Sequence, residues 1–338
     1  MAVYTEVAFG DAAALVERLN LGVLTDLKGI KGGIENTNYF ITCEHEGQTV
    51  EHVLTLFERL SFEQLPFYLR LMKHLAGKGI PVPEPVTDAA GEIVHRLCDK
   101  PASIVNKLKG GNQLAPSATH CAAVGDMLAR MHLAGRDFGM SQPNLRGLAW
   151  WNETIPVVLP HLSPEQSTLI RGELAYQNHV AASPAYAALP KGPVHADLFR
   201  DNVMFDGERL TGFFDFYFAG VDTFAFDIAV CLNDWCIVHA PKDAVRDGQP
   251  EPALVAAFME AYESVRPLED AERRLMPAMK RAAALRFWTS RLWDWHLPRD
   301  ASMLQPHDPA HFEYVIRQCL KSDLKVPDVA TTSTEATA

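Results

Sequence analysis

The sequence predicts an α+β fold in two lobes, a small antiparallel sheet followed by a larger, mostly helical part. Two observations support this order. Short apolar and β-branched runs separated by turn residues lie before residue 109, whereas long segments of helical periodicity dominate after Gly110-Gly111. The chain of 338 residues is long enough for two such lobes. We expect the first lobe at residues 1–107, the helical lobe at 108–325 and a disordered, threonine-rich tail at 326–338.

The first lobe begins with a helix and continues as strands. Apolar residues recur at helical spacing in 11–20, and a turn rich in glycine and asparagine follows at 28–38. Glu46-Gly47 predicts a hairpin turn. An apolar stripe predicts a second helix at 61–76, with Ser61 as its N-cap. Four strands are expected, at or near 39–43, 53–57, 91–97 and 102–108.

The second lobe carries long helical patterns around one irregular segment. Apolar residues recur at helical spacing in five segments, at 117–134, 163–182, 222–238, 251–264 and 268–296. Between the second and third of these, residues 190–221 are dense in Asp, Phe and Gly. That composition predicts short strands and loops, which is where site residues commonly lie.

Composition excludes several classes of protein. The formal net charge is −11, which argues against a nucleic-acid-binding or anionic-membrane surface, because both need excess Lys and Arg. No run of about 18 apolar residues occurs, and the first ten residues lack the pattern of a signal peptide. The six cysteines form no CxxC pair and indicate buried thiols in a reducing compartment. We therefore expect a cytoplasmic protein that acts on small molecules.

The strongest chemical signal is the segment His195-Ala-Asp197-Leu-Phe-Arg-Asp-Asn202. An Asn follows the Asp by five residues, the spacing of the catalytic loop of protein kinases. A second carboxylate, Asp215, lies downstream between aromatic residues. Phosphoryl transfer needs one carboxylate to accept the hydroxyl proton and hard oxygen ligands for Mg²⁺. Asp197 is thus the candidate base, and Asn202 and Asp215 are the candidate metal ligands.

Residues 194–230 resemble the aminoglycoside-phosphotransferase and choline-kinase superfamily. There, an H-x-D-x4-N loop precedes a D-F/W strand and an aromatic-Asp-Leu-Ala helix start, which Phe226-Asp227-Ile-Ala229 matches. Leu128-Ala-Arg-Met-His132 is similar to another helix of the superfamily. The resemblance implies a protein-kinase-like fold that uses ATP and Mg²⁺. It also implies that Asp227 braces the catalytic loop and that His132 is a packed core histidine.

Within the superfamily, four phrases resemble the kinase-like homoserine kinases. They are Gly32-Gly-Ile-Glu-Asn-Thr-Asn-Tyr-Phe40, Val53-Leu-Thr-Leu-Phe-Glu58, Arg146-Gly-Leu-Ala-Trp150 and Arg286-Phe-Trp-Thr-Ser-Arg-Leu292. The resemblance extends to about residue 320 and implies phosphorylation of the homoserine hydroxyl in threonine biosynthesis.

The glycine-rich turn is expected to cover the ATP phosphates. Glycines let backbone N–H groups approach phosphate closely, and Asn tolerates the left-handed conformations of such loops. The candidate residues are Lys31, Gly32, Gly33, Asn36 and Asn38. The alternative is a tight turn without a ligand.

One expected residue is missing. Protein kinases place a Lys on the third strand, whereas Thr55 occupies that position here. Lys31 or Arg59 could supply the charge, or could be solvated surface residues. The glutamate that usually pairs with the strand lysine, which we place at Glu63, then lacks its partner.

The strand at 103–107 is expected to hold the adenine through backbone groups of Val105 to Lys107. Three charged side chains are candidates for binding the acceptor: Arg200, Arg291 and Asp294. The last two lie three residues apart on one helical face, which is equally typical of an exposed salt bridge.

Three alternatives remain open from the residues. The first is a kinase of another small alcohol with the same fold, acting on choline, methylthioribose or an aminoglycoside. The second is a nucleotide-binding pseudokinase, motivated by Thr55. The third is a metal-dependent hydrolase using His195 and Asp197, which would require a transition metal.

Overall fold

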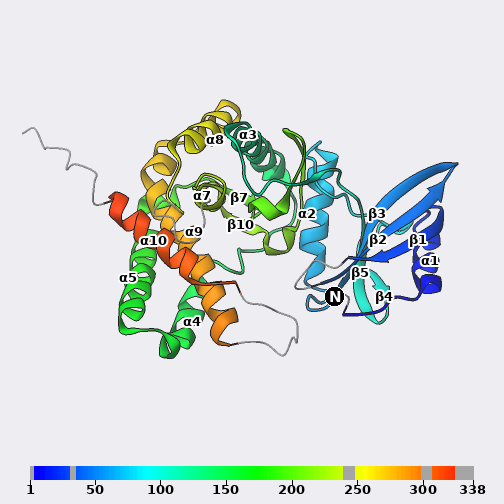
Figure 1. The fold of residues 1–338 in the computed structure, drawn as a ribbon, viewed down its shortest axis with the longest axis horizontal. Helices are drawn as coiled ribbons and strands as arrows, with labels where there is room; N and C mark the ends of the chain where they lie inside the picture. Colours follow the sequence, from blue (N-terminus) through cyan, green and yellow to red (C-terminus); the bar gives the residue numbers. More distant parts are fainter. Residues whose placement is uncertain (1–3, 31–35, 239–247, 298–306, 324–338) are drawn as a thin grey trace, which may run out of the picture.

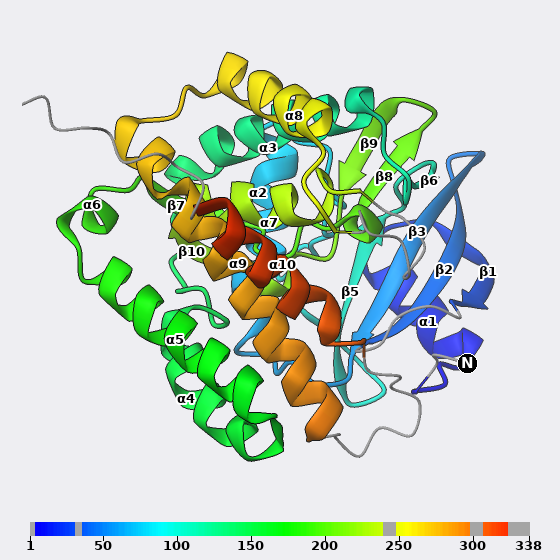
Figure 2. The ribbon, with the colours of Figure 1, turned by 60° about the vertical axis from the view of Figure 1, so that its left-hand side comes forward.

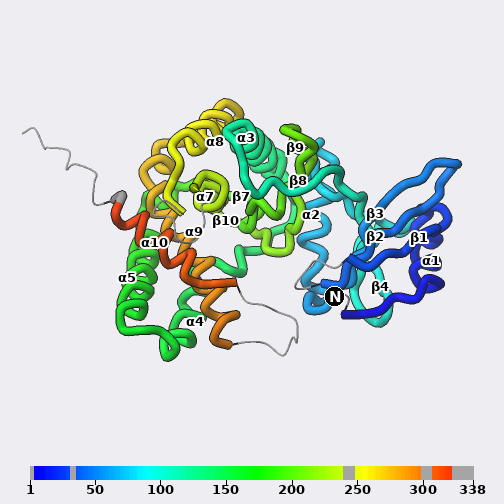
Figure 3. The backbone as a smooth tube through the Cα atoms, viewed as in Figure 1, coloured from blue at the N-terminus to red at the C-terminus, as the bar shows by residue number. Residues whose placement is uncertain are grey.

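The structure is a computed structural model that describes residues 4–30, 36–238, 248–297 and 307–323. Figure 1 shows β1–β5 and α1 on one side and most helices, together with β7 and β10, on the other, with α2 between the two sides. The same path is followed as a tube in Figure 3. The sheet-first, helices-second order predicted from the sequence is confirmed. The expected boundary near residue 107 falls between β5 and β6.

The first lobe is built on a five-stranded antiparallel sheet in the order β1-β2-β3-β5-β4. Its strands are β1 (Val23–Gly29), β2 (Asn36–His45), β3 (Gln48–Phe57), β4 (His95–Leu97) and β5 (Lys100–Asn106). The predicted hairpin turn joins β2 to β3, and Glu46 and Gly47 both have positive φ, at 51° and 76°. Two consecutive left-handed residues are the geometry of a tight two-residue hairpin.

Two helices accompany the sheet, and both begin elsewhere than predicted. Helix α1 (Phe9–Arg18) contacts β1 and β4. Helix α2 (Leu65–Gly77) begins after Gln64, so Ser61 as an N-cap was wrong. The cause is a turn in which the Gln64 N–H donates to the Ser61 carbonyl at 3.2 Å, while the Ser61 hydroxyl donates to Glu63 at 2.6 Å.

The second lobe is mainly helical. Its α-helices are α3 (Ala118–Ala134), α4 (Leu148–Val158), α5 (Pro164–Ala181), α6 (Pro184–Ala187), α7 (Phe224–Asp234), α8 (Pro252–Val265), α9 (Asp270–His296) and α10 (Ala310–Asp323). Short strands carry the irregular segment: β7 (Lys191–Val194) pairs with β10 (Gly220–Thr223), and β8 (Val203–Asp206) pairs with β9 (Arg209–Phe213) and β6 (Gly111–Asn112). Figure 2 shows α10 lying across α9, with α4 and α5 beside them.

The predicted helices of this lobe are present, and α4 and α10 were missed. Ser117 and Ser163 cap α3 and α5 through complete capping boxes, which explains why those starts were predicted within one residue. Helix α7 stops at Asp234, four residues before its predicted end. Helix α4 was missed because it is short and contains Pro156. Helix α10 was missed although Phe312, Val315, Ile316 and Cys319 are buried at helical spacing.

Three hydrophobic cores hold the chain together. One lies between α1 and the sheet. A second joins α2 to α3, α7, α8 and the β8–β9 hairpin. A third is formed mainly by α4, α5, α7, α9 and α10. The six cysteines are free thiols. In the part of the chain that the structure describes, no helix has both the length and the apolar character needed to cross a membrane.

Candidate active site

A buried carboxylate fixes the start of the catalytic loop. The loop leaves β7 at His195, and the Asp227 side chain accepts hydrogen bonds from the backbone N–H groups of His195 and Ala196, both at 2.8 Å. Ala196 has a φ of 62°, which a non-glycine residue adopts only when other contacts hold it there. The bracing role predicted for Asp227 is confirmed.

His132 completes this brace from α3. Its Nε2 lies 3.1 Å from Asp227, its Nδ1 lies 2.7 Å from the Tyr262 hydroxyl, and the side chain is buried. Burial lowers the pKa of His132. Burial alone would raise the pKa of Asp227, but hydrogen bonds from His132 and the His195 backbone lower it below the ordinary value. The prediction that His132 is a packed core residue is confirmed.

The structure brings the three candidate catalytic residues together. The Asn202 amide donates to the Asp197 carbonyl at 2.8 Å and to the Asp197 carboxylate at 3.3 Å. The Asn202 carbonyl accepts from the N–H of Phe214 at 3.0 Å. The Phe214 carbonyl is 2.9 Å from Nε2 of His195. These bonds tie the loop to the segment that carries Asp215.

Asp215 is held in an uncommon conformation between β9 and a 3-10 turn. Its φ and ψ are 64° and 57°, in the left-handed region, where a non-glycine residue is a marker of function or strain. The negative charge of Asp215 is one of the influences that raise the pKa of Asp197, which places the two carboxylates near one another.

The environment of Asp197 raises its pKa to about 8. Burial is the largest cause, the positive charge of Arg286 opposes it, and the negative charge of Asp215 adds to it. Arg286, on α9, places Nη2 3.5 Å from the Asp197 carboxylate, and its side chain is 4% exposed. Arg286 begins one of the four segments that resemble the homoserine kinases, but it was not among the predicted site residues. A usable signal was its position in a helix segment whose neighbours are apolar.

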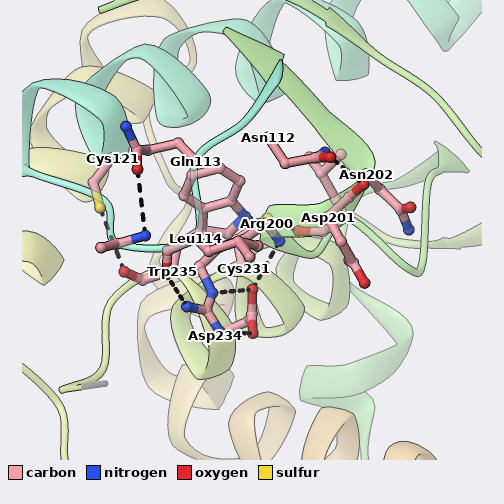
Figure 4. Close-up of polar contacts among 12 residues, drawn as sticks. Asn112, Gln113, Leu114, Cys121, Arg200, Asp201, Asn202, Cys231, Asp234 and Trp235 are labelled. Carbon is pink, nitrogen blue, oxygen red and sulfur yellow. Dashed lines mark hydrogen bonds and ion pairs between the residues drawn. The ribbon is translucent and has the colours of Figure 1, made fainter. Parts of the chain in front are cut away.

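Arg200 has partners other than the acceptor that we predicted for it. Its guanidinium pairs with Asp234 at 3.1 Å and donates to the Leu114 carbonyl, and its backbone N–H also donates to Asp234 at 2.8 Å (Figure 4). These contacts fix the loop to α7 and to the segment before α3. The acceptor role predicted for Arg200 stays a prediction that these contacts do not test.

Arg291 and Asp294 both lie on α9. Arg291 donates to the Asp308 carbonyl at 3.0 Å and stacks on Phe312 at 4.5 Å. Burial lowers the pKa of Arg291. Its guanidinium thus joins α9 to the start of α10. Asp294 is half-buried one turn further along the helix.

The candidate nucleotide residues are described only in part. Lys31, Gly32 and Gly33 lie outside the described residues. Asn36 and Asn38 belong to β2, where the strand begins three residues earlier than predicted.

The strand position that lacks a lysine has a defined contact. Thr55 is buried opposite Asn38, and its hydroxyl donates to the Asn38 side-chain oxygen at 2.7 Å. Arg59 is exposed just beyond β3. Glu63 accepts from Ser61 ahead of α2, so placing it on a helix was wrong.

The backbone of the proposed adenine strand is partly used within the sheet. The Lys107 N–H donates to the Glu51 carbonyl at 3.3 Å, and the Ile104 carbonyl accepts from Val86 at 2.9 Å. The Lys107 side chain pairs with Glu51 at 2.8 Å. Val105 pairs with Val53 in the ladder. These backbone groups are therefore already engaged within the sheet, and the adenine role of Val105 to Lys107 stays a prediction.

Asn202 and Asp215 suit a hard cation. Their oxygens are the ligand type that Mg²⁺ prefers, and Mg²⁺ commonly takes few protein ligands together with phosphate oxygens and water. The Asn202 nitrogen points to Asp197, which orients the amide group. Within the described residues, no group of three or more His, Cys, Asp or Glu side chains could hold a metal ion, as a transition-metal hydrolase would require.

The chain was compared with known families and proteins. The model of the phosphotransferase enzyme family matches residues 26–277. A homoserine kinase of Polaromonas naphthalenivorans (strain CJ2) is 64% identical over 320 residues, which cover 95% of this chain and 98% of that protein. A homoserine kinase of Janthinobacterium sp. (strain Marseille) is 55% identical over 317 residues, covering 94% and 95%.

Solved structures show the same fold at low identity. Amicoumacin kinase hAmiN, in complex with AMP-PNP, Ca²⁺ and Ami, aligns with a TM-score of 0.65 at 18% identity, covering 88% of each chain. A choline kinase of Cryptosporidium parvum aligns with a TM-score of 0.61 at 13% identity, covering 88% of this chain and 89% of that one. These likenesses confirm the predicted protein-kinase-like architecture.

Proposed function

The chain belongs to the phosphotransferase enzyme family, and we propose that it transfers the γ-phosphoryl group of ATP to the hydroxyl of L-homoserine. The observation that carries this proposal is the 64% identity to a homoserine kinase over nearly the full length of both chains. The site geometry supports it, because Asp197, Asn202 and Asp215 have the chemical types and the arrangement that phosphoryl transfer needs.

Asp197 is the residue that accepts the proton of the acceptor hydroxyl. Its backbone carbonyl and carboxylate are both fixed by Asn202, and Asp227 fixes the two preceding backbone N–H groups. Arg286 favours the ionised form that a base requires. Because these groups are positioned before the substrates bind, less entropy is lost in aligning the hydroxyl with the phosphorus.

We assign Asn202 and Asp215 as the residues that hold Mg²⁺. When bound, the metal would supply positive charge that neutralises the phosphates. Asn202 contributes a side-chain oxygen whose direction is set by its bonded amide nitrogen, and Asp215 contributes a carboxylate from a conformationally fixed turn.

The nucleotide is placed against the first lobe. The glycine-rich segment with Lys31, Gly32 and Gly33 covers the phosphates, and Asn36 and Asn38 flank it on β2. Because the Lys107 N–H is used inside the sheet, the adenine pairs with backbone groups that follow this N–H. A cytoplasmic location for the protein also belongs to this proposal.

The test is ADP release from Mg-ATP with L-homoserine, run beside choline, methylthioribose, kanamycin and no acceptor. We expect homoserine-dependent ADP together with O-phosphohomoserine, identified by mass spectrometry. Turnover of a different acceptor would overturn the substrate and keep the reaction class. ATP binding without turnover of any acceptor would overturn the activity itself and favour the pseudokinase alternative raised by Thr55. Omission of Mg²⁺ should abolish turnover.

A further inference from the structure

Two arginines from distant parts of the sequence meet on one aromatic ring beside the active site. The Arg286 guanidinium lies 4.8 Å from the centre of the Phe218 ring, and the Arg146 guanidinium lies 5.9 Å from the centre of the same ring. Phe218 ends the 3-10 turn that begins directly after Asp215. Two positive charges therefore flank the segment that carries a candidate metal ligand.

Both arginines are held in place by several contacts. Arg286 also stacks on Phe287 at 3.9 Å and pairs with Asp197 at 3.5 Å. Arg146 stacks on Trp150 at 4.5 Å. A guanidinium that is ordered before binding loses little entropy when it binds a ligand, so these side chains suit a recognition role.

The backbone around Arg146 is fixed as well. Its N–H donates to the Asn144 side chain at 2.9 Å, and its carbonyl accepts from the Trp151 indole at 2.6 Å. Asn144 in turn donates to Asp222 at 2.8 Å. These bonds anchor the turn before α4 to the segment before α7, and they set the direction from which Arg146 approaches Phe218.

We propose that Arg286 and Arg146 form the subsite that binds the carboxylate of the acceptor. This inference rests on the proposed function and names the residues that make it selective. Arginine recognises carboxylates through paired donors, and a buried guanidinium next to the base disfavours an acceptor that carries only a positive charge. An amino acid with a side-chain hydroxyl is thereby preferred over a cationic amino alcohol.

The spacing fits a short hydroxy amino acid. An acceptor hydroxyl that is hydrogen-bonded to Asp197 lies about 2.7 Å from an oxygen of the Asp197 carboxylate. The hydroxyl and carboxylate groups of homoserine are about 5 Å apart when the chain is extended. Arg286 Nη2 is 3.5 Å from Oδ1 of Asp197, so the two side chains are close enough for one acceptor molecule to contact both.

The experiment compares acceptors with and without the carboxylate, and then proteins with and without the guanidinium charge of Arg286 or Arg146. Steady-state kcat/KM is measured at pH 9 for L-homoserine, L-homoserine amide and 3-aminopropan-1-ol, and KM is measured for ATP. The proteins are wild type, Arg286→Met, Arg286→Lys, Arg146→Met and the control Arg281→Lys. Arg281 is also buried on α9, where it pairs with Glu173 at 2.7 Å.

For wild type we expect homoserine to exceed its amide by about 10- to 100-fold in kcat/KM, the range of one charged hydrogen bond. Arg286→Met reduces this ratio to below about 3-fold and leaves KM for ATP unchanged. Arg286→Lys gives an intermediate ratio, because the charge stays and the paired donors are lost. Arg146→Met reduces the ratio less, since Arg286 is the arginine that lies 3.5 Å from the Asp197 carboxylate. Arg281→Lys retains the wild-type ratio.

A ratio that stays at the wild-type value in both Arg286 variants overturns the inference, even when overall activity falls. Equal kcat/KM values of the wild-type enzyme for homoserine and its amide also overturn the inference. This result does not depend on whether any variant folds. Absence of homoserine turnover in the wild type is a different outcome, because it removes the proposed function on which the subsite rests.

Discussion

Replacing Asp227 by Asn tests whether one buried carboxylate holds the catalytic loop. The side chain is fully buried and accepts from the N–H groups of His195 and Ala196 and from His132. Asn keeps the size of the side chain but offers one acceptor oxygen, and its NH₂ group faces a donor. The substitution therefore isolates the charge and its hydrogen bonds.

The loss in the free energy of unfolding of Asp227→Asn can be derived from these contacts. A hydrogen bond to a charged group contributes about 1.5–3 kcal/mol, and at least one such bond is lost while another donor is left buried. Ala196 also depends on the brace, since its left-handed backbone costs about 1–2 kcal/mol. We expect a loss of about 3–5 kcal/mol in the free energy of unfolding, the range found when a buried charged pair is broken.

The assay is urea unfolding at pH 7, with kcat measured on the folded fraction. Asp222→Asn is the matched control. Asp222 also accepts two hydrogen bonds, from Asn144 at 2.8 Å and from the Thr223 N–H at 2.7 Å, but burial raises its pKa. When burial already disfavours the ionised form of a carboxylate, its replacement by a neutral amide removes less stability. The free energy of unfolding of the control should therefore fall by only about 1 kcal/mol.

The pH dependence gives a second readout. The pKa of Asp227 is lower in the fold than its ordinary value of 3.8. Its stabilising contribution is therefore present above about pH 4 and is lost as the pH falls through the folded-state pKa. Asp227→Asn should flatten this part of the acid unfolding curve. Equal losses for the Asp227 and Asp222 variants, or a normal kcat in Asp227→Asn, would refute the reasoning.

Three further outcomes are expected. Asp197→Asn should lower kcat by about 10³-fold, the range of a lost general base, with an unchanged melting temperature; near-normal turnover would remove Asp197 from its role. Arg286→Met should shift the acidic limb of the kcat/KM profile to higher pH, because Arg286 opposes the burial that raises the pKa of Asp197; an unmoved limb contradicts this. Gly125→Ala should cost about 2–3 kcal/mol in urea unfolding, since a Cβ would lie 2.2 Å from the Phe258 carbonyl, whereas Gly172→Ala, with open space around it, should be stabilising by about 0.5–1 kcal/mol.

Much of the fold and the centre of the site could be predicted from short segments of the sequence. The H-x-D-x4-N spacing led to Asp197 and Asn202 because the loop that joins them is short and its contacts are local. Ser117 and Ser163 marked helix starts through interactions within a single turn. The Glu46-Gly47 turn fixed a hairpin for the same reason.

Contacts between distant segments could not be predicted in this way. Arg200 reaches Asp234, and Arg286 reaches Asp197, only after the helical lobe is packed. A charged residue in a helix carries no local mark of its partner. The left-handed backbone at Asp215 is likewise set by its surroundings, since a non-glycine residue gives no signal for that conformation.

The division of the hydrophobic cores has a consequence for motion. Helix α2 belongs to the first lobe in sequence, yet its buried face packs in the core that contains α3, together with Phe57 of β3 and Val105 of β5, and not in the core between α1 and the sheet. The sheet and α1 close a core of their own, to which β3 and β5 connect the rest of the chain. In native-state hydrogen exchange, the amides of β1, β2 and α1 should therefore open as one cooperative unit while α2 stays protected. Residues of β1, β2 and α1 can thus open and re-form without disturbing the loop that carries Asp197.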